Sequence, residues 1–243
     1  MKAWALPGVA VAAAVTGGVG VLAYDHLAVP GGPEQARIER VVRDYVLTHP
    51  EIVSDAMHRL AERDTAAAIA ANRDAITTPV GDAWAGNAKG DVTVVEYFDY
   101  NCGYCRASLP IIDRLVAGDS NIRVVFRDLP ILAPSSGLAA QMSVAAARAG
   151  RFKPFHDALY AAGPVTDATI AASARKAGVD PATLGRDARS PAVVDTVRAN
   201  LATQRALGLT GTPSFIIGDR LLTGAQPLAD LQAAIADARK RGA

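Results

Sequence analysis

Apolar residues recur at helical spacing in the region 34–78. Ile38, Val41, Val42, Tyr45 and Val46 fall on one face of a helix. His49-Pro50 interrupts this face, and Pro50 suits the first position of a second helix. There the apolar positions continue at Ile52, Val53, Ala56, Met57 and Leu60 before an alanine-rich stretch. The pattern predicts an N-terminal helical extension whose apolar stripe needs a partner surface.

Short apolar runs replace this spacing further along the chain. Residues 92–98 and 122–126 read VTVVEYF and IRVVF, and a helix is predicted between them, which indicates a parallel pair of strands with a right-handed crossover. A short strand and turn are expected over 80–90. Phe215 to Ile217 and Leu221-Leu222 flank Gly218-Asp219 as a hairpin. A closing helix follows at 228–239, so the pattern predicts an α/β fold.

Helical patterns occupy the region between the second predicted strand and the hairpin. Pro130, Pro134 and Gly137 mark the exit from the sheet. The expected helices are Leu138 to Ala149, Phe152 to Ala161, Thr166 to Ala177, Pro181 to Ala188 and Pro191 to Leu207. We interpret residues 130–204 as a helical domain inserted into the α/β domain formed by 79–129 and 205–243.

Composition limits the classes of partner that are expected and indicates the cellular compartment. The chain has 243 residues, half of them hydrophobic, and a net charge of +1 with no basic run, so nucleic acid is not an expected partner. Met1-Lys2 precedes an uncharged Ala-, Val- and Gly-rich stretch, which predicts that residues 1–23 are an export signal cleaved before Tyr24 or a retained membrane anchor. Residues 24–33 are a linker. Either alternative places the rest outside the cytoplasm.

Both cysteines of the chain lie in one C-x-x-C motif at the junction of a strand and a helix. This arrangement is typical of a redox dithiol, because the N-terminus of a helix favours the thiolate form of a cysteine. Cys102 is therefore the expected attacking sulfur, and Cys105, one turn further, the resolving one. The site needs no cofactor beyond the redox-active disulfide that these two residues can form.

Three other interpretations of the cysteine pair are less consistent with the sequence. Two core thiols would need no such motif, and a zinc site would need four ligands, which no second cysteine pair or nearby histidine supplies. A structural disulfide across so small a loop would add little stability. His49 and His58 are expected at the surface or at helix ends, and His156 as a capping or packing residue, so no metal site is predicted.

Two further features add to the motif. Glu96 lies six residues before Cys102, on the strand face of Val92, Val94 and Phe98, where desolvation would raise its pKa and allow it to exchange a proton with Cys105 through water. The alternative is an edge-strand acid that faces solvent. Thr212-Pro213 precedes the strand SFII, and a cis bond there would turn the Thr212 backbone towards a docked peptide.

Three stretches resemble the DsbA-like branch of the thioredoxin-fold thiol-disulfide oxidoreductases. They read VVEYFDYNCGYCR, GRFKPFHDALY and GLTGTPSFIIGDRLLTGAQP and lie within residues 80–238. The resemblance implies a thioredoxin fold with an inserted helical domain that covers the dithiol and forms one wall of a peptide groove. It also implies that Cys102 and Cys105 are the redox pair, Glu96 the buried acid, and Thr212-Pro213 the cis-proline loop, with Gly103 and Tyr104 contacting substrate.

The dipeptide between the cysteines departs from the strongly oxidising members, which carry Pro-His. Gly103-Tyr104 looks more like isomerases and the copper-sensitivity-suppressor (ScsC-like) type, whose N-terminal helices mediate self-association. Residues 34–78 are accordingly expected either to form a homo-oligomer or to pack on their own catalytic domain.

Three functions are consistent with these features. The first is an oxidase for exported proteins that a membrane redox partner reoxidises. The second is an isomerase or reductase that acts on unfolded or mispaired exported proteins and is kept reduced by a membrane donor. The third is a copper-binding or copper-protecting protein, because soft thiolates select Cu(I).

Overall fold

The computed structural model describes residues 32–242, which form two compact units that divide between Arg59 and Leu60. The predicted signal or anchor, residues 1–23, and most of the linker lie outside the described residues. Within residues 32–242, no helix is both long and apolar enough to cross a membrane.

The first unit contains α2 (Pro33–Thr48) and the start of α3 (Glu51–Ala71), with the predicted break at His49-Pro50. Pro33 occupies the first turn of α2, and the His49 N–H bonds to the carbonyl of Tyr45 to end this helix. α2 has no buried residue. The predicted apolar stripe is exposed along both helices, at Ile38, Val41, Val42, Tyr45, Ile52, Val53, Met57 and Leu60.

The second unit is built on a five-stranded mixed sheet. Its strands are β1 (Trp84–Gly86), β2 (Val92–Phe98), β3 (Ile122–Asp128), β4 (Ser214–Ile217) and β5 (Arg220–Thr223), in the order β1-β3-β2-β4-β5. β2 and β3 are parallel, as predicted, and every other pair is antiparallel. β2 lies at the centre, so the strand that leads into the C-x-x-C motif has a partner on each side.

Alternation along β2 separates two hydrophobic cores. Val92, Val94 and Phe98 point to the face covered by α5 (Gly103–Gly118) and α11 (Leu228–Lys240). Val95 and Tyr97 point to the opposite face, which the end of α3 and α4 (Arg73–Thr77) cover. Glu96 therefore shares the α5 face, as the sequence predicts.

Two arginines fix the helices that cover these faces. Arg127 on β3 is buried and donates to the backbone carbonyls of residues 75, 76 and 78, which hold α4 against the sheet. On the other face, Arg239 of α11 forms ion pairs with Asp91 before β2 and Asp119 after α5, at 2.7 and 2.8 Å. α11 is thereby joined to both ends of the segment that carries the motif.

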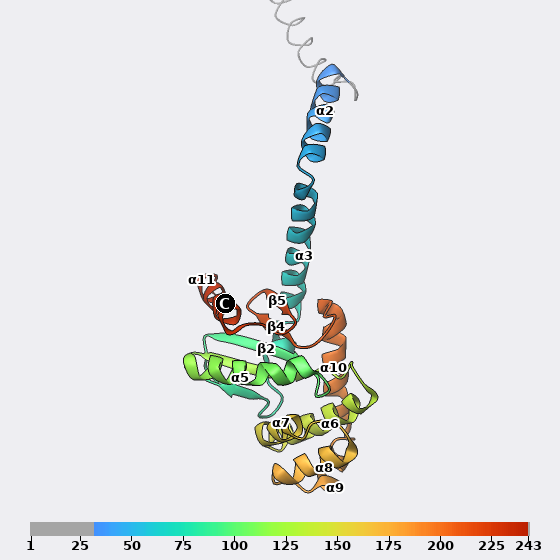
Figure 1. Ribbon diagram of the computed structural model, residues 1–243, viewed down its shortest axis with the longest axis vertical. Helices are drawn as coiled ribbons and strands as arrows, with labels where there is room; N and C mark the ends of the chain where they lie inside the picture. Colours follow the sequence, from blue (N-terminus) through green and yellow to red (C-terminus); the bar gives the residue numbers. More distant parts are fainter. Residues whose placement is uncertain (1–31, 243) are drawn as a thin grey trace, which may run out of the picture. The chain divides into compact units, whose positions relative to one another are not determined.

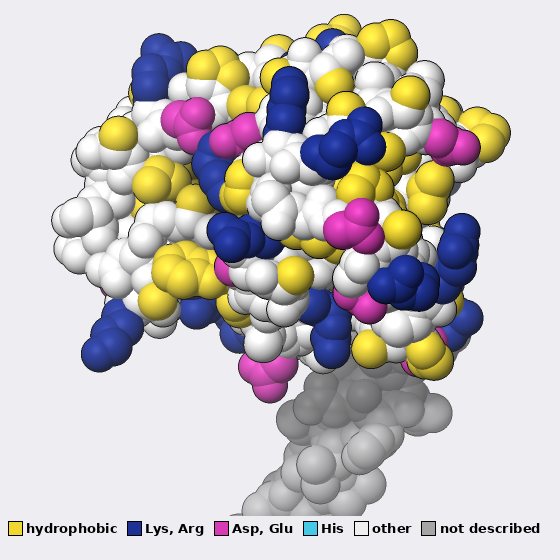
Figure 2. Space-filling model, turned by 90° about the horizontal axis from the view of Figure 1, so that it is seen from below, with side chains coloured by type: hydrophobic (Ala, Val, Ile, Leu, Met, Phe, Trp, Pro, Cys, Tyr) yellow, Lys and Arg dark blue, Asp and Glu magenta, His cyan; other side chains and the backbone are white. Residues whose placement is uncertain are grey.

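The region between β3 and β4 is helical, as expected. It comprises α6 (Pro134–Arg148), α7 (Phe152–Ala161), α8 (Asp167–Lys176), α9 (Pro181–Asp187) and α10 (Pro191–Leu207), and Figure 1 shows α6 to α9 grouped beyond the sheet. α6 begins four residues earlier than predicted, because Pro134 suits the first turn and the Ser136 hydroxyl accepts the Ala133 N–H. The face of the second unit seen in Figure 2, from below relative to Figure 1, carries interspersed basic, acidic and apolar side chains.

Candidate active site

The two cysteines meet at the start of α5. Cys102 is the N-cap residue, and its sulfur accepts the backbone N–H of Cys105 at 3.4 Å. Both thiols are free, and Cys102 is 5% exposed whereas Cys105 is 1% exposed. An N–H aimed at the Cys102 sulfur, at the positive end of a helix, stabilises negative charge there. The geometry thus gives Cys102 the outer position and Cys105 the inner one.

The loop that precedes β4 lies beside the outer sulfur. The Thr212–Pro213 peptide bond is cis, as the resemblance implied, and Cys102 Sγ donates to the Thr212 carbonyl at 3.2 Å. The Pro213 carbonyl accepts the Gly224 N–H at 2.8 Å, which ties this loop to the end of β5. Residues 110 positions apart in the chain are therefore in direct contact at the thiol.

Glu96 is buried on the strand face that it shares with Val94 and Phe98. Neither carboxyl oxygen has a hydrogen-bond partner among the described residues, and burial raises the pKa of Glu96 to about 8. The pKa of Cys105 is also raised, mainly by burial and secondarily by negative charge on Glu96. Negative charge on this buried acid therefore disfavours the thiolate of the inner cysteine.

Exposed apolar side chains lie in the first turn of α5 and in the loop after β3. Gly103 begins α5, and Tyr104, in its first turn, is 70% exposed. In the loop between β3 and α6, Ile131 and Leu132 are 36% and 50% exposed. Exposed apolar groups of this kind suit contact with an unfolded polypeptide.

Asp99, which the sequence analysis did not single out, organises the loop before Cys102. Its carboxylate is buried and accepts hydrogen bonds from Asn101 N–H, the Ser136 hydroxyl, and the N–H groups of Ile131 and Leu132. Its backbone carbonyl accepts Cys102 N–H at 2.9 Å. One signal was available: Asp99 directly follows β2, and an aspartate at the start of a turn commonly accepts the backbone N–H two residues further on.

The comparisons with known proteins follow the same division of the chain. Residues 93–236, more than half of the sequence, match the family described as DSBA-like thioredoxin domain. The chain belongs to this family. Residues 34–67 match a second family, described as the copper resistance protein ScsC N-terminal domain. The first match covers most of the sheet-containing unit, and the second covers α2 and most of α3.

Solved structures agree with this assignment. A thioredoxin-like oxidoreductase from Silicibacter pomeroyi is 39% identical, with a TM-score of 0.65 over 70% of this chain and 98% of that one. The thiol-disulfide exchange protein alpha-DsbA2 from Wolbachia pipientis is 29% identical, with a TM-score of 0.66 over 72% and 96%. A Proteus mirabilis ScsC variant, at 23% identity and a TM-score of 0.71, shares the fold over 88% of this chain and 99% of its own.

Curated relatives are much longer proteins. The Na(+)/H(+) antiporter NhaA of Herminiimonas arsenicoxydans is 34% identical over 160 residues, which are 65% of this chain and 25% of that protein. NhaA 1 of Salinispora arenicola is 30% identical over 169 residues, 63% of this chain and 24% of its own length. The chain thus spans about a quarter of the length of the curated relatives it matches.

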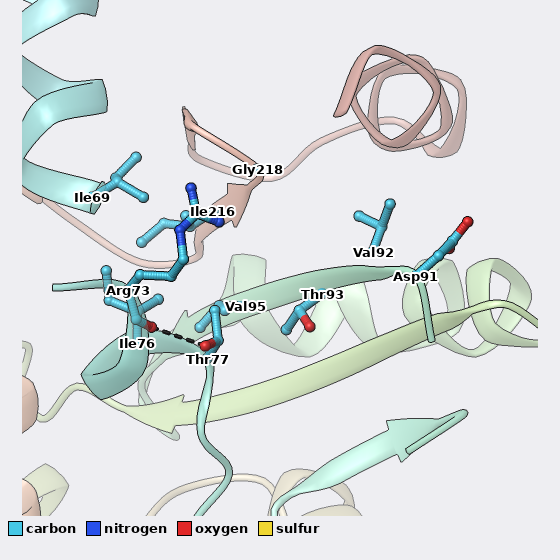
Figure 3. A pocket seen from close by; sticks show the side chains of 10 residues that line it. All are labelled: Ile69, Arg73, Ile76, Thr77, Asp91, Val92, Thr93, Val95, Ile216 and Gly218. Atoms are coloured by element: carbon cyan, nitrogen blue, oxygen red, sulfur yellow. Dashed lines mark hydrogen bonds between the residues drawn. The ribbon is translucent and has the colours of Figure 1, made fainter. Parts of the chain in front are cut away.

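A cavity elsewhere in the second unit does not belong to the dithiol site. It has a volume of about 140 Å³, and Ile69, Ile76, Val95 and Ile216 are among its lining residues, with the Arg73 side chain extending among them (Figure 3). Val95 points to the sheet face opposite Glu96, so this cavity lies across the sheet from the inner thiol. Within residues 32–242, no three His, Cys, Asp or Glu side chains cluster as a metal site.

His156 packs inside the aromatic core of the same unit, consistent with the predicted packing role. Its ring lies 4.9 Å from Phe98 and 4.8 Å from Phe152, and Nδ1 is 3.1 Å from the Tyr100 hydroxyl. Burial, with a smaller effect from Lys153, lowers the pKa of His156 from 6.5 to about 3. The folded protein therefore excludes a proton that the unfolded chain binds below about pH 6.5.

We expect His156→Phe to make the protein more resistant to acid. In the wild type, this histidine reduces the free energy of unfolding by about 1.4 kcal/mol per pH unit as the pH falls from about 6.5 towards 3. Phenylalanine fits the aromatic surroundings and cannot titrate. Relative to pH 7.5, the variant should gain about 2 to 3 kcal/mol over the wild type at pH 4.5 in urea unfolding. The exposed His58, changed to Phe, is the control, and an equal gain there would contradict the assignment.

Proposed function

We propose that this protein exchanges disulfides with exported proteins outside the cytoplasm, with Cys102 and Cys105 as its redox pair. The observation that carries the proposal is the position of Cys102: it caps α5, accepts the Cys105 N–H, and contacts the Thr212 carbonyl beside cis-Pro213. This arrangement leaves one sulfur at the edge of the site and places the second directly behind it.

The exchange runs in two displacements. The Cys102 thiolate attacks one sulfur of a substrate disulfide, which forms a mixed disulfide and releases the other substrate sulfur as a thiolate. Cys105, once deprotonated, attacks Cys102 Sγ and releases the second substrate thiol, so the substrate gains two electrons and the enzyme becomes a disulfide. The reverse sequence introduces a disulfide into a reduced substrate and leaves the enzyme reduced.

Glu96 is proposed to move the proton that the second displacement requires. Cys105 is buried, and its raised pKa means that it rarely ionises on its own. The Glu96 carboxyl, with a pKa of about 8, can accept that proton near neutral pH and return it in the reverse reaction, through water if needed.

The substrates are proposed to be unfolded or mispaired exported polypeptides. Tyr104, Ile131 and Leu132 provide exposed apolar contacts, while the Thr212 carbonyl next to Cys102 can accept a backbone N–H from an extended peptide. Gly103 adds no side chain at the start of α5, which leaves room for the peptide. A membrane redox partner would restore the working oxidation state.

Export is proposed from the N-terminal segment. Residues 1–23 have the composition of a signal or anchor, and dithiol enzymes that make or correct disulfides work in oxidising compartments. Sequencing the N-terminus of the exported protein separates the alternatives, since cleavage would leave Tyr24 as the first residue.

Self-association through residues 34–78 is proposed as well. The apolar stripe of α2 is exposed, with Val41 at 62%, and the region matches the ScsC N-terminal domain over 34–67. An apolar stripe on a helix is typically buried against a second surface. A second copy of the same helices would provide one. An assembled enzyme would present several dithiols to one mispaired substrate, which favours an isomerase.

Two measurements on the purified protein test the oxidoreductase and assembly proposals together. We expect reactivation of scrambled ribonuclease, and a native mass equal to that of two or more chains. Val41→Glu with Met57→Glu should reduce the mass to a single chain, whereas the exposed control Arg40→Glu should not. A single-chain mass for the wild type would contradict self-association. Failure to reactivate ribonuclease, together with fast oxidation of a reduced peptide, would indicate an oxidase.

A copper-binding role is the second candidate, and the ScsC match at residues 34–67 favours it. Two adjacent thiolates suit Cu(I). If the wild type shows no exchange activity but takes up copper, and Cys102→Ser abolishes that uptake, this candidate is supported over an oxidoreductase. Unchanged uptake in that variant would exclude the dithiol as the copper site.

A further inference from the structure

We propose that Asp99 is a positioning residue that ties the loop carrying the exposed apolar pair Ile131–Leu132 to the turn that carries Cys102, so that exchange with polypeptides depends on it. The inference rests on the proposed oxidoreductase function. It adds a residue outside the C-x-x-C motif that would govern which substrates the dithiol serves.

The Asp99 carboxylate joins two segments that are distant in the chain. Oδ1 accepts the Asn101 N–H at 2.9 Å and the Ser136 hydroxyl at 2.7 Å. Oδ2 accepts the N–H groups of Ile131 and Leu132 at 2.9 and 3.0 Å. One oxygen therefore serves the turn that leads into Cys102 and the start of α6, and the other serves the loop after β3.

The loop after β3 has an orientation that apolar burial alone would not produce. Leu129 is fully buried, and its N–H bonds to the Phe98 carbonyl at 2.7 Å. At Ile131 and Leu132, the backbone N–H groups point inward to Asp99, while the apolar side chains are 36% and 50% exposed. A buried carboxylate thus fixes the backbone of two residues whose side chains are presented to solvent.

The backbone of Asp99 binds the catalytic turn at the same time. Its carbonyl accepts Cys102 N–H at 2.9 Å and the Tyr160 hydroxyl at 3.0 Å, and its N–H lowers the pKa of Cys105, against the larger raising effect of burial. These backbone contacts do not depend on the carboxylate. Loss of the carboxylate should therefore release the apolar pair while the attacking sulfur stays in place.

Two substrates separate these effects. A small disulfide such as oxidised glutathione needs only the thiol. A disulfide-bonded peptide with apolar residues beside its cysteine can also contact Ile131 and Leu132. For Asp99→Ser, whose hydroxyl can still accept Asn101 N–H but lacks the second oxygen, we expect KM for the apolar peptide to rise about tenfold. Its kcat, and both constants for oxidised glutathione, should change less than about twofold.

A double-mutant cycle tests the route of the effect. Ile131→Ser with Leu132→Ser removes the exposed side chains without removing a buried group, and should raise KM for the peptide by a similar factor. Adding Asp99→Ser to this pair should then have no further effect on KM. The matched control is Asp82→Ser, which removes another carboxylate bonded to a backbone N–H, that of Phe152. It should leave the ratio of the two substrates unchanged.

Each outcome supports or overturns the inference. Equal losses of kcat/KM with both substrates in Asp99→Ser would show that Asp99 acts on the dithiol, and would overturn the inference. A further rise in KM when Asp99→Ser is added to Ile131→Ser and Leu132→Ser would overturn it as well. Should Asp99→Ser not fold, Asp99→Asn serves in the same cycle, since its amide must present N–H to one of the two groups of donors. A wild type inactive on both substrates would refute the oxidoreductase function instead.

Discussion

Cys102→Ser and Cys105→Ser should both lose catalytic turnover, but only the second should become covalently attached to substrate. Without Cys102, the remaining sulfur is almost fully buried and its pKa is raised, so attack on a polypeptide disulfide should fall to the uncatalysed rate. Without Cys105, Cys102 still attacks, but no second sulfur resolves the mixed disulfide. The adduct should accumulate and appear in intact-mass measurements as enzyme plus substrate, removable by reductant.

Ser108→Ala is the matched control for this pair. Ser108 lies on the same helix and is buried, and its hydroxyl donates to the Tyr104 carbonyl, so its removal should leave turnover within a few-fold of wild type. Adducts on Cys102→Ser, with none on Cys105→Ser, would show that the roles of the two sulfurs are reversed. Full turnover in either cysteine variant would exclude dithiol exchange.

The reactive groups could be predicted from sequence because their signals are local. Each signal spans only a few residues: the C-x-x-C motif, the apolar run before it, and the proline before SFII. Alternation along β2 was enough to place Glu96 on the face that α5 covers. The contact of Cys102 with Thr212 could be expected only through the family resemblance, since 110 residues separate them.

Asp99 and Arg127 could not be found in this way. Asp99 binds loop N–H groups 32 and 33 positions away, and Arg127 binds carbonyls about 50 positions earlier. Backbone donors and acceptors are present at nearly every residue, so such bonds leave no mark in composition or periodicity. Charge patterning would place both side chains at the surface, yet both are buried. Their partners become visible only when the fold brings the segments together.

Glu96→Gln should have opposite effects on stability and on catalysis. The pKa of Glu96 is raised from 4.5 to about 8, so between these pH values the folded protein keeps a proton that the unfolded chain releases. The free energy of unfolding of the wild type therefore falls as pH rises through this window, by about 1.4 kcal/mol per unit from this group. Glutamine does not titrate. The variant should gain stability relative to wild type from pH 5 to pH 8, measured by urea unfolding.

Catalysis should decline in the same variant, because glutamine cannot accept the Cys105 proton. We expect the second displacement to slow by about 100-fold near pH 7, within the usual range for loss of a general base. The mixed disulfide should then build up transiently, which rapid quenching and mass measurement detect, and the dependence of this step on a group with a pKa near 8 should disappear. Glu39→Gln, at an exposed position of α2, should alter neither quantity. A stability gain without any change in the resolution rate would mean that Glu96 is a buried acid with no part in proton transfer, and that Cys105 loses its proton directly to water.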